Sequence, residues 1–202
     1  MRIIFATGNK NKLREIRGIM SDLEYEIVTA AEVGIESDPD EDGDSFEENA
    51  LIKARAVYEA TDKTSIVMAD DSGLCVDHLG GERGELGIHS ARFMGHDTSY
   101  DLKNKAILEK LKDVPEQERT ARFVCAVAAV FPSGREAVVR ESMEGYIAYE
   151  IAGENGFGYD PIFYLSEFGK TSAEISPEAK NLISHRGKAL RHMRAVLAEA
   201  GL

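Results

Sequence analysis

Two stretches of the sequence combine small residues with charges in a way that suits phosphate chemistry. The first is TGNKNK, Thr7–Lys12, which directly follows the apolar run Arg2–Ala6. Where a strand passes into a helix, the first backbone N–H groups of the helix lack partners and carry partial positive charge, which favours anions. Gly8 allows the backbone to approach a ligand closely, and Lys10 and Lys12 add formal charge. The turn predicts an anion cradle, although the Walker pattern is absent and an ordinary strand–helix turn with solvated lysines also fits.

The second stretch is ADDSG, which ends the apolar run Ser65–Ala69. Ligands of open α/β sheets bind outside the carboxyl ends of strands. Adjacent residues of a strand alternate sides, so at most one of Asp70 and Asp71 points into a given cleft, and the other can hydrogen-bond backbone. Carboxylate oxygens suit Mg²⁺, and the acidic loop Asp38–Asp42 could supply a second one. A turn-capping aspartate pair and a solvated charge run are the alternatives.

Two motifs in the last third of the chain could contact a nucleoside. GFGYDPIF, Gly156–Phe163, places two glycines around an aromatic residue, an arrangement that can lay a ring against a planar ligand or can serve tight-turn packing alone. In SHRGKAL, Ser184–Leu190, adjacent His185 and Arg186 could hydrogen-bond a heterocycle or a phosphate. An exposed His-Arg pair without a ligand is the alternative.

Apolar periodicity and cap residues predict strands alternating with helices, hence an α/β fold with a mixed sheet. A loop is expected over Gly80–Gly87, and another over Gly153–Tyr164 leading into a short strand. The expected strands are Arg2–Ala6, Ser65–Ala69, Arg122–Phe131 and Glu136–Ser142, the last two forming a hairpin. The expected helices are Lys12–Met20, Ser45–Ala60 with Ser45 as cap, one capped by Asp97 or Thr98 and running to about Lys112, one starting at Ser176-Pro177-Glu178, and Ala189–Ala200.

Length and charge limit the classes of function. The 202 residues suit one domain, or one domain with two lobes. The formal charge of -12 argues against a duplex nucleic-acid partner, and no apolar stretch is long enough to span a bilayer. Cys75 and Cys125 lie in apolar runs, which predicts buried, reduced thiols and a cytoplasmic protein. A small polyanion remains compatible, because a metal ion and a few lysines can reverse the sign locally.

Six motifs together resemble one family over essentially the whole chain. TGNKNK, FEENALIKA, ADDSGL, SARF, FGYDPIF and SHRGKAL occur in the order typical of the Ham1-like inosine/xanthosine triphosphate pyrophosphatases. The resemblance implies a single domain over residues 1–202, with an elongated mixed sheet flanked by helices and an active-site cleft between two lobes. It also implies a cytoplasmic homodimer that uses Mg²⁺ to hydrolyse ITP, dITP and XTP to the monophosphate and pyrophosphate.

The resemblance also assigns roles to residues at the matching motif positions. Asp71 would be the general base and a metal ligand, with Asp40 or Glu41 as the second acidic ligand. Gly43 favours Asp40 by its spacing, but the loop is one residue longer than usual. The triphosphate would contact Thr7, Gly8, Asn9, Lys10, Asn11, Lys12 and Lys53, with Ser72 as a further substrate contact. The nucleoside would be enclosed by Phe157, Gly158, Tyr159, Asp160, Lys180, His185 and Arg186.

One loop departs from the family pattern. The family often has GxPGVYSAR after ADDSGL, whereas this chain has GERGELGIHSAR over Gly81–Arg92, with His89 where the tyrosine would stand. The difference bears on loop conformation and dimer contacts rather than on the chemistry. Two other functions fit parts of the pattern: a transferase that uses the same phosphate cradle, and a non-catalytic nucleotide sensor. The carboxylates at Asp70, Asp71 and the acidic loop count against a sensor.

Overall fold

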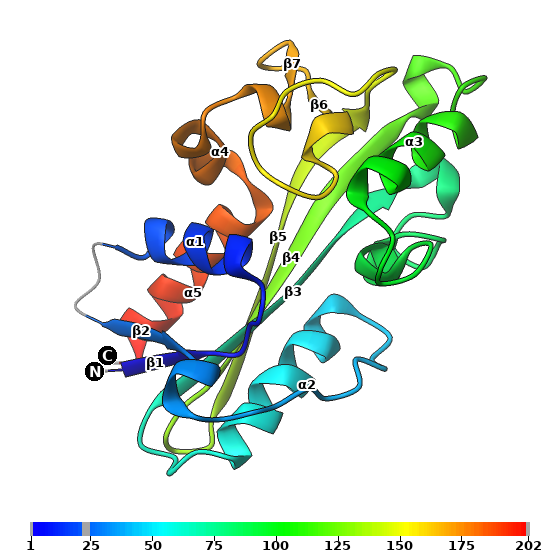
Figure 1. Cartoon of the computed structure of the whole chain (residues 1–202). Coiled ribbons are helices and arrows are strands. Elements are labelled where there is room, and N and C mark those ends of the chain that lie inside the picture. Colours follow the sequence, from blue (N-terminus) through cyan, green and yellow to red (C-terminus); the bar gives the residue numbers. More distant parts are fainter. Residues whose placement is uncertain (1, 22–24, 201–202) are drawn as a thin grey trace. The chain divides into compact units, whose positions relative to one another are not determined.

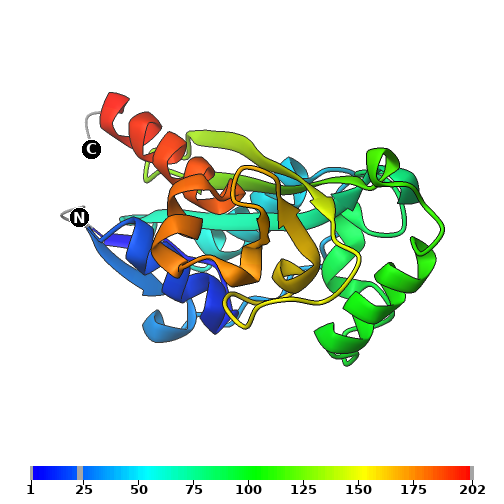
Figure 2. The same cartoon turned by 90° about the horizontal axis from the view of Figure 1, so that it is seen from above.

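The computed structural model describes residues 2–21 and 25–200, which form an α/β fold (Figures 1 and 2). The strands are β1 (Arg2–Phe5), β2 (Glu26–Thr29), β3 (Ile66–Val76), β4 (Thr120–Val130), β5 (Glu136–Ile147), β6 (Phe163–Leu165) and β7 (Lys170–Thr171). The α-helices are α1 (Lys10–Ile19), α2 (Phe46–Glu59), α3 (Tyr100–Lys110), α4 (Pro177–Ile183) and α5 (His185–Glu199). Within the described ranges, no helix is long and apolar enough to cross a membrane.

The strands form one seven-stranded sheet in the order β2-β1-β3-β4-β5-β6-β7. β1 pairs in parallel with both β2 and β3, and its Ile4 lies opposite Val28 and Val67. β6 pairs antiparallel with β5 and with β7. The predicted mixed sheet is confirmed. The hairpin of β4 and β5 is also confirmed, since the two strands are neighbours joined by a tight turn in which Phe131 N–H donates to Arg135 O.

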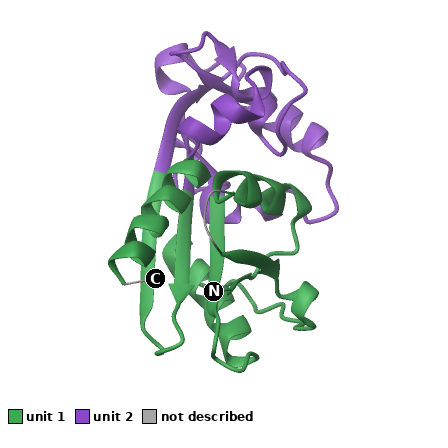
Figure 3. Ribbon diagram, turned by 90° about the vertical axis from the view of Figure 1, so that its left-hand side faces the viewer, with its two compact units in different colours: residues 1–72, 125–141, 185–202 green, residues 73–124, 142–184 purple. Residues whose placement is uncertain are grey.

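The chain divides into two compact units (Figure 3). The first comprises residues 1–72, 125–141 and 185–202, and the second comprises residues 73–124 and 142–184. β3, β4 and β5 contribute residues to both units. Each unit has its own apolar core.

The first unit has helices on both faces of its strands (Figure 1). Ile3 and Phe5 of β1 share a buried cluster with Ile16 of α1 and with Leu190 and Met193 of α5. Side chains alternate along a strand, so Ile4 and Val67, which are also buried, face the side on which α2 lies. An apolar stripe of this helix is buried there, at Phe46, Ala50, Ala54, Val57 and Tyr58.

The second unit encloses a buried cation. Its core includes Leu111, Phe123, Ile147 and Phe163. The guanidinium of Arg119 lies inside and donates to the carbonyls of Leu111, Ile147 (2.8 Å) and Ala148 (2.6 Å). One side chain therefore joins the end of α3 to the end of β5, and no local sequence pattern predicted this contact.

Several expected boundaries were wrong. β3 does not end at Ala69 but continues through the aspartates to Val76, because the following residues stay buried and extended. Neither Asp97 nor Thr98 caps α3; the cap is Ser99, whose hydroxyl accepts from Leu102 N–H. The last helix starts at His185 rather than Ala189, and β2 was not expected at all.

The caps at Ser45 and Ser176 were predicted correctly. Both cysteines are buried thiols, as expected. The glycine-rich loop is folded closely on itself: at Gly87, with φ of 52°, an added Cβ would lie 1.8 Å from Glu82 O. A left-handed backbone in such close contact requires glycine.

Replacing Arg119 with Met tests its structural role. The substitution keeps much of the apolar stem but leaves three carbonyls without their shared donor. Because a buried unsatisfied polar group costs about 1–3 kcal/mol, we expect the free energy of unfolding in urea to fall by at least about 2 kcal/mol. Arg83→Met, at an exposed arginine, is the matched control and should change it by less than about 0.5 kcal/mol. Equal losses for the two variants would contradict this role.

Candidate active site

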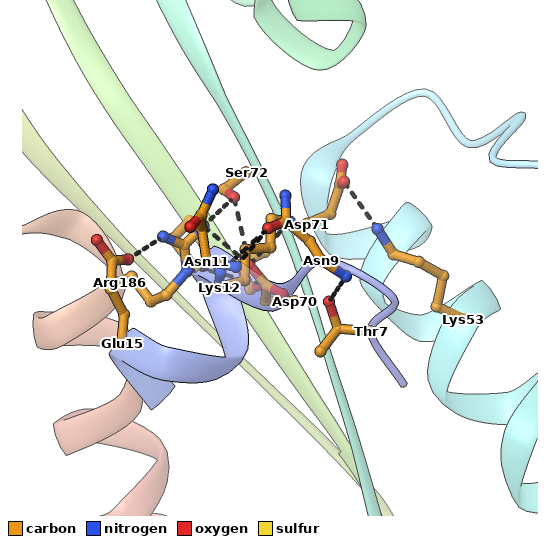
Figure 4. A network of polar contacts seen from close by, with 12 residues as sticks. Thr7, Asn9, Asn11, Lys12, Glu15, Lys53, Asp70, Asp71, Ser72 and Arg186 are labelled. Atoms are coloured by element: carbon orange, nitrogen blue, oxygen red, sulfur yellow. Dashed lines mark hydrogen bonds and ion pairs between the residues drawn. The ribbon is translucent and has the colours of Figure 1, made fainter. Parts of the chain in front are cut away.

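The turn between β1 and α1 is built largely by its own side chains. Asn9 is the N-cap of α1, and its Oδ1 accepts from the N–H groups of Asn11 (2.9 Å) and Lys12 (3.2 Å). Asn9 N–H in turn donates to Thr7 Oγ1 at 3.2 Å, a contact visible in Figure 4. The chain thus caps two of the N–H groups that were expected to lack partners. At Gly8 an added Cβ would meet no described atom within 4 Å, and this leaves room for a ligand beside the backbone.

Asp70 is the centre of a buried ion-pair network (Figure 4). Its Oδ2 lies 3.1 Å from Lys12 Nζ and accepts from both Nε (3.3 Å) and Nη2 (3.2 Å) of Arg186. Arg186 also donates to Ser72 Oγ at 2.8 Å and to Glu15. The network joins β3 to α1 and α5. One of the two aspartates was expected to hydrogen-bond backbone. Asp70 instead pairs with two cations, Lys12 and Arg186.

Asp71 faces a different cation. Its Oδ1 lies 2.9 Å from Lys53 Nζ, and the same ammonium donates to Glu41 Oε2 at 3.1 Å. The predicted alternation of the two aspartates along the strand is therefore present: Asp70 pairs with residues of α1 and α5, and Asp71 with a residue of α2. Of the two acidic residues proposed as a second ligand, the structure brings Glu41 to the cation shared with Asp71. Asp40 is exposed and has no hydrogen bond or ion pair with a described residue.

The pKa values of the two neighbouring carboxyl groups are shifted in opposite directions. Burial disfavours the charged form of Asp70, but Lys12 and Arg186 outweigh it and hold the pKa of Asp70 well below its ordinary value. At Asp71 burial prevails over the opposing effect of Lys53 and Lys12, so the pKa of this carboxyl is raised. Pairs of carboxyl groups whose pKa values are pushed apart are typical of acid–base sites. Asp71 is the better proton acceptor of the two.

The FGYDPIF motif forms a separate network in the second unit. Asp160 Oδ2 accepts from Phe157 N–H (2.8 Å) and Lys180 Nζ (2.7 Å), and its Oδ1 accepts from Ser172 Oγ (3.0 Å). Gly156 has φ of 76°, and a Cβ there would lie 2.2 Å from Asp160 Oδ2, so this position requires glycine. Asp160 and Lys180 are buried and hold the loop in place.

The aromatic residues of this loop are positioned in the same unit. Lys180 Nζ lies 5.1 Å from the centroid of the Phe157 ring. The hydroxyl of Tyr159 donates to Ser90 O at 2.6 Å, and its ring packs edge-on against Tyr100. Gly158 O accepts from Asn104 Nδ2 at 3.1 Å. The half-buried Phe157 therefore sits on a loop fixed at several points, although its contact with a nucleoside stays a prediction.

The remaining predicted residues differ in exposure. Lys10 and Asn11 are exposed at the start of α1, and Lys10 has no ion pair among the described side chains. His185 and Arg186 are buried in the first turn of α5. Since Arg186 is engaged by Asp70, Glu15 and Ser72, the structure gives it a clear part in the network; a role in base recognition stays a prediction.

The residues around Asp71 fit a divalent cation. Asp71 Oδ2 is buried and has no hydrogen-bond partner among the described residues, while Glu41 shares a cation with the other oxygen. Across residues 2–21 and 25–200, no group of three or more His, Cys, Asp or Glu side chains is arranged to hold a metal. Mg²⁺ does not need one, because it commonly binds through one or two carboxylates together with water and substrate phosphates.

Two site residues were missed by sequence reasoning. Glu15 lies on α1 and reaches Arg186 on α5, a contact that depends on packing between distant segments and leaves no local pattern. Asn49 lies on α2 and accepts from Gly43 N–H at 2.9 Å. A signal for Asn49 was present: it is a polar residue next to Ala50 and one turn after Phe46, within the apolar stripe of its helix.

A parallel β–α core with a glycine-containing turn, lysines and paired carboxylates defines a class of phosphate-binding α/β proteins. Comparison with family models identifies one family within this class: the model of the Ham1 family matches residues 3–196. The chain belongs to the Ham1 family.

Known proteins similar to this chain agree with that assignment. The "dITP/XTP pyrophosphatase" of Caldanaerobacter subterraneus subsp. tengcongensis is 44% identical over 194 residues, which cover 96% of this chain and 94% of that protein. The one of Bacillus subtilis is 42% identical, covering 96% of each. Among solved structures, a HAM1 protein from Coxiella burnetii matches with a TM-score of 0.85 and 36% identity, covering 98% of this chain and 99% of that one.

Replacing Asp70 with Asn tests the buried network. The variant keeps the shape but leaves the charges of Lys12 and Arg186 with less compensation. Removing one partner of a buried ion pair typically costs about 3–5 kcal/mol; with Glu15 still paired to Arg186, we expect the free energy of unfolding to fall by about 2–4 kcal/mol.

The matched control for this variant is Glu26→Gln, which removes a carboxylate from the exposed pair with Arg2. It should cost at most about 1 kcal/mol. If urea unfolding gave Asp70→Asn the same stability as Glu26→Gln, the network would not be a major source of stability.

Proposed function

We propose that this chain hydrolyses non-standard purine nucleoside triphosphates (ITP, dITP and XTP) to the nucleoside monophosphate and pyrophosphate. The observation that supports this proposal most directly is that Lys53 contacts the carboxylates of both Asp71 and Glu41 in a chain of the Ham1 family. The names of the relatives as dITP/XTP pyrophosphatases support the same activity. The activity would remove deaminated purines from the nucleotide pool.

In this mechanism the side chains of the first unit bind the triphosphate, orient the attacking water and accept its proton. Lys10, Lys12 and Lys53 counter the charge of the triphosphate, since phosphoryl transfer depends mainly on positioning and electrostatics. Asp71 orients the attacking water and accepts its proton as the bond to the α-phosphorus forms and pyrophosphate leaves. The raised pKa of Asp71 makes it a stronger base than an exposed aspartate.

We propose Mg²⁺ as the metal, held by Asp71 and Glu41. When bound, it supplies a divalent charge that stabilises the charge on the phosphate oxygens. The contacts of Lys53 with both carboxylates favour Glu41 over Asp40 as the second ligand.

Selectivity would come from hydrogen-bond matching at the base. Hypoxanthine and xanthine present an acceptor at C6 and a donor at N1, whereas adenine presents the reverse. Donors fixed at C6 would face the adenine amino group, and an unpaired buried contact of that kind costs about 1–3 kcal/mol. We assign these donors to His185, Arg186 and nearby backbone N–H groups, with Phe157 against the base plane. Guanine shares the C6 acceptor, so its exclusion needs a separate contact near C2.

We further propose that the chain works as a single Ham1-type domain, as a homodimer, in the cytoplasm, and without a nucleic-acid or membrane partner. The family match over residues 3–196 supports one functional domain. The charge of -12 and the buried thiols Cys75 and Cys125 support the location and the absence of nucleic acid.

A panel of nucleoside triphosphates tests the proposed function. With Mg²⁺ present, ITP, dITP and XTP should release pyrophosphate and monophosphate, and their kcat/KM should exceed that of ATP by about tenfold or more. Pyrophosphate and orthophosphate are measured separately. Orthophosphate alone would indicate a phosphatase, turnover that requires an acceptor would indicate a transferase, and binding without turnover would indicate a sensor. Equal kcat/KM values for ATP, GTP and ITP would refute the proposed selectivity.

Asp71→Asn tests the general base. Because general-base help is typically worth about 10²–10⁴-fold, kcat for ITP at saturating Mg²⁺ should fall by at least about 10²-fold, with the circular dichroism spectrum unchanged. Asp113→Asn, at an exposed aspartate of the second unit, is the control and should keep normal turnover. Near-normal kcat in Asp71→Asn would remove this residue from the mechanism.

A further inference from the structure

Asn49 is a buried polar side chain in the middle of an apolar surface. It lies in the first turn of α2, near the buried residues Phe46 and Ala50 along the helix, and is fully buried. Its Oδ1 accepts from Gly43 N–H at 2.9 Å, while its Nδ2 has no hydrogen-bond partner among the described residues. A buried donor without a partner opposes folding, so an apolar residue of the same shape would serve packing better. The amide therefore calls for an explanation other than stability.

The contact with Gly43 is one of three that attach the acidic loop to α2. Asp44 N–H donates to Glu48 Oε2 at 2.7 Å, and Glu41 Oε2 lies 3.1 Å from Lys53 Nζ. The loop and the helix therefore run in opposite directions. Asp44 pairs with Glu48, the earlier Gly43 pairs with the later Asn49, and the still earlier Glu41 pairs with the still later Lys53. The loop thus runs along the first two turns of α2 in a defined register. Asn49 provides the middle contact.

Gly43 fits closely at this middle contact. A Cβ added to it would lie 2.8 Å from Glu48 Cβ and 2.9 Å from Asn49 Oδ1. Neither neighbour is the end of a long flexible side chain, so the backbone of Gly43 lies directly against the helix. Glu41 stands two residues before this point, and its carboxylate reaches the ammonium that also binds Asp71.

Charge explains why the middle contact is made by an amide rather than a carboxylate. The segment around Gly43 contains Asp42 and Asp44, and the first turn of α2 contains Glu47 and Glu48. A further carboxylate at position 49 would repel these groups and would be buried without a cation of its own. A neutral amide oxygen accepts from the Gly43 N–H without adding charge.

We propose that Asn49 is a positioning residue: by holding the backbone of Gly43 against α2, it fixes Glu41 where one divalent cation can be shared by Glu41 and Asp71. This role rests on the proposed function, because it assumes that these two carboxylates hold the metal. The role explains why an amide is buried here although its Nδ2 group lacks a partner: its Oδ1 holds the backbone of the proposed metal-binding loop. Groups that orient metal ligands commonly contribute 10–100-fold to metal affinity.

Asn49→Leu is the informative variant, because leucine has a similar shape and cannot accept a hydrogen bond. Mn²⁺ is the probe, and its binding to the protein alone is followed by the electron paramagnetic resonance signal of the unbound ion. We expect the Kd for Mn²⁺ to rise about tenfold, and the Mg²⁺ concentration for half-maximal pyrophosphate release from ITP to rise in parallel. Unchanged values of both would overturn the proposal.

Val57→Ala on the same helix is the matched control. Val57 is buried in the core and lies more than two turns after Asn49. The variant creates a small cavity and lowers Tm, but the Kd for Mn²⁺ should stay at the wild-type value. If Val57→Ala weakened Mn²⁺ binding as much as Asn49→Leu does, the effect of Asn49 would be general loosening of α2, and the positioning role would fail.

A double-mutant cycle with Glu41→Gln asks whether Asn49 acts through Glu41. Each single variant should weaken Mn²⁺ binding, and adding Asn49→Leu to Glu41→Gln should weaken it by less than about twofold further. Fully additive effects would overturn the proposed route, and so would a wild-type protein that binds no Mn²⁺. The proposed function fails separately: if the panel of triphosphates gave no pyrophosphate while the cycle behaved as expected, Asn49 would still position a metal site of different activity.

Discussion

Two carboxyl groups in consecutive positions of a buried strand are the constraint on which this site depends. Burying a carboxylate is costly unless a cation compensates it, and the alternation of a strand sends Asp70 and Asp71 to different surroundings. Asp70 is compensated by Lys12 of α1 and Arg186 of α5, and Asp71 by Lys53 of α2. The helices that build the apolar core of the first unit are thus the same ones that bring the required cations to β3.

The number of cations at each carboxylate separates a structural group from a reactive one. With two cations, Asp70 stays ionised and its pKa lies well below the ordinary range. Asp71 has one direct cation partner, which it shares with Glu41, and burial leaves its pKa raised. A buried carboxylate paired with two cations has little tendency to take a proton, whereas one whose burial is only partly offset by a single shared cation gains from a proton or a metal ion. The difference follows from position on the strand and not from residue type.

Sequence reasoning predicted the parts of this structure that depend on local patterns. Apolar periodicity and capping serines located the helices, including the caps at Ser45 and Ser176, and motif order identified the family. It failed where packing between distant segments decides: β3 continues past the aspartates because residues up to Val76 are buried, and Arg186 is drawn into a network by Glu15, 171 positions away. The choice between Asp40 and Glu41 was also left open, because spacing alone cannot say which side chain reaches Lys53.

The charge of the network explains why a metal ion belongs in the proposed site although three cations are already present. In formal charge, the three cations Lys12, Lys53 and Arg186 of these ion pairs face four acidic side chains, those of Glu15, Glu41, Asp70 and Asp71, so these seven residues together carry one negative charge in excess. A triphosphate would meet repulsion from such a cluster. A divalent cation changes the sign of the sum from minus one to plus one, and shared binding by Glu41 and Asp71 would release Lys53 from the two carboxylates to the phosphates. The ammonium that bridges these carboxylates shows that one positive centre can serve both, so the same geometry that stabilises the protein favours the metal and then the substrate.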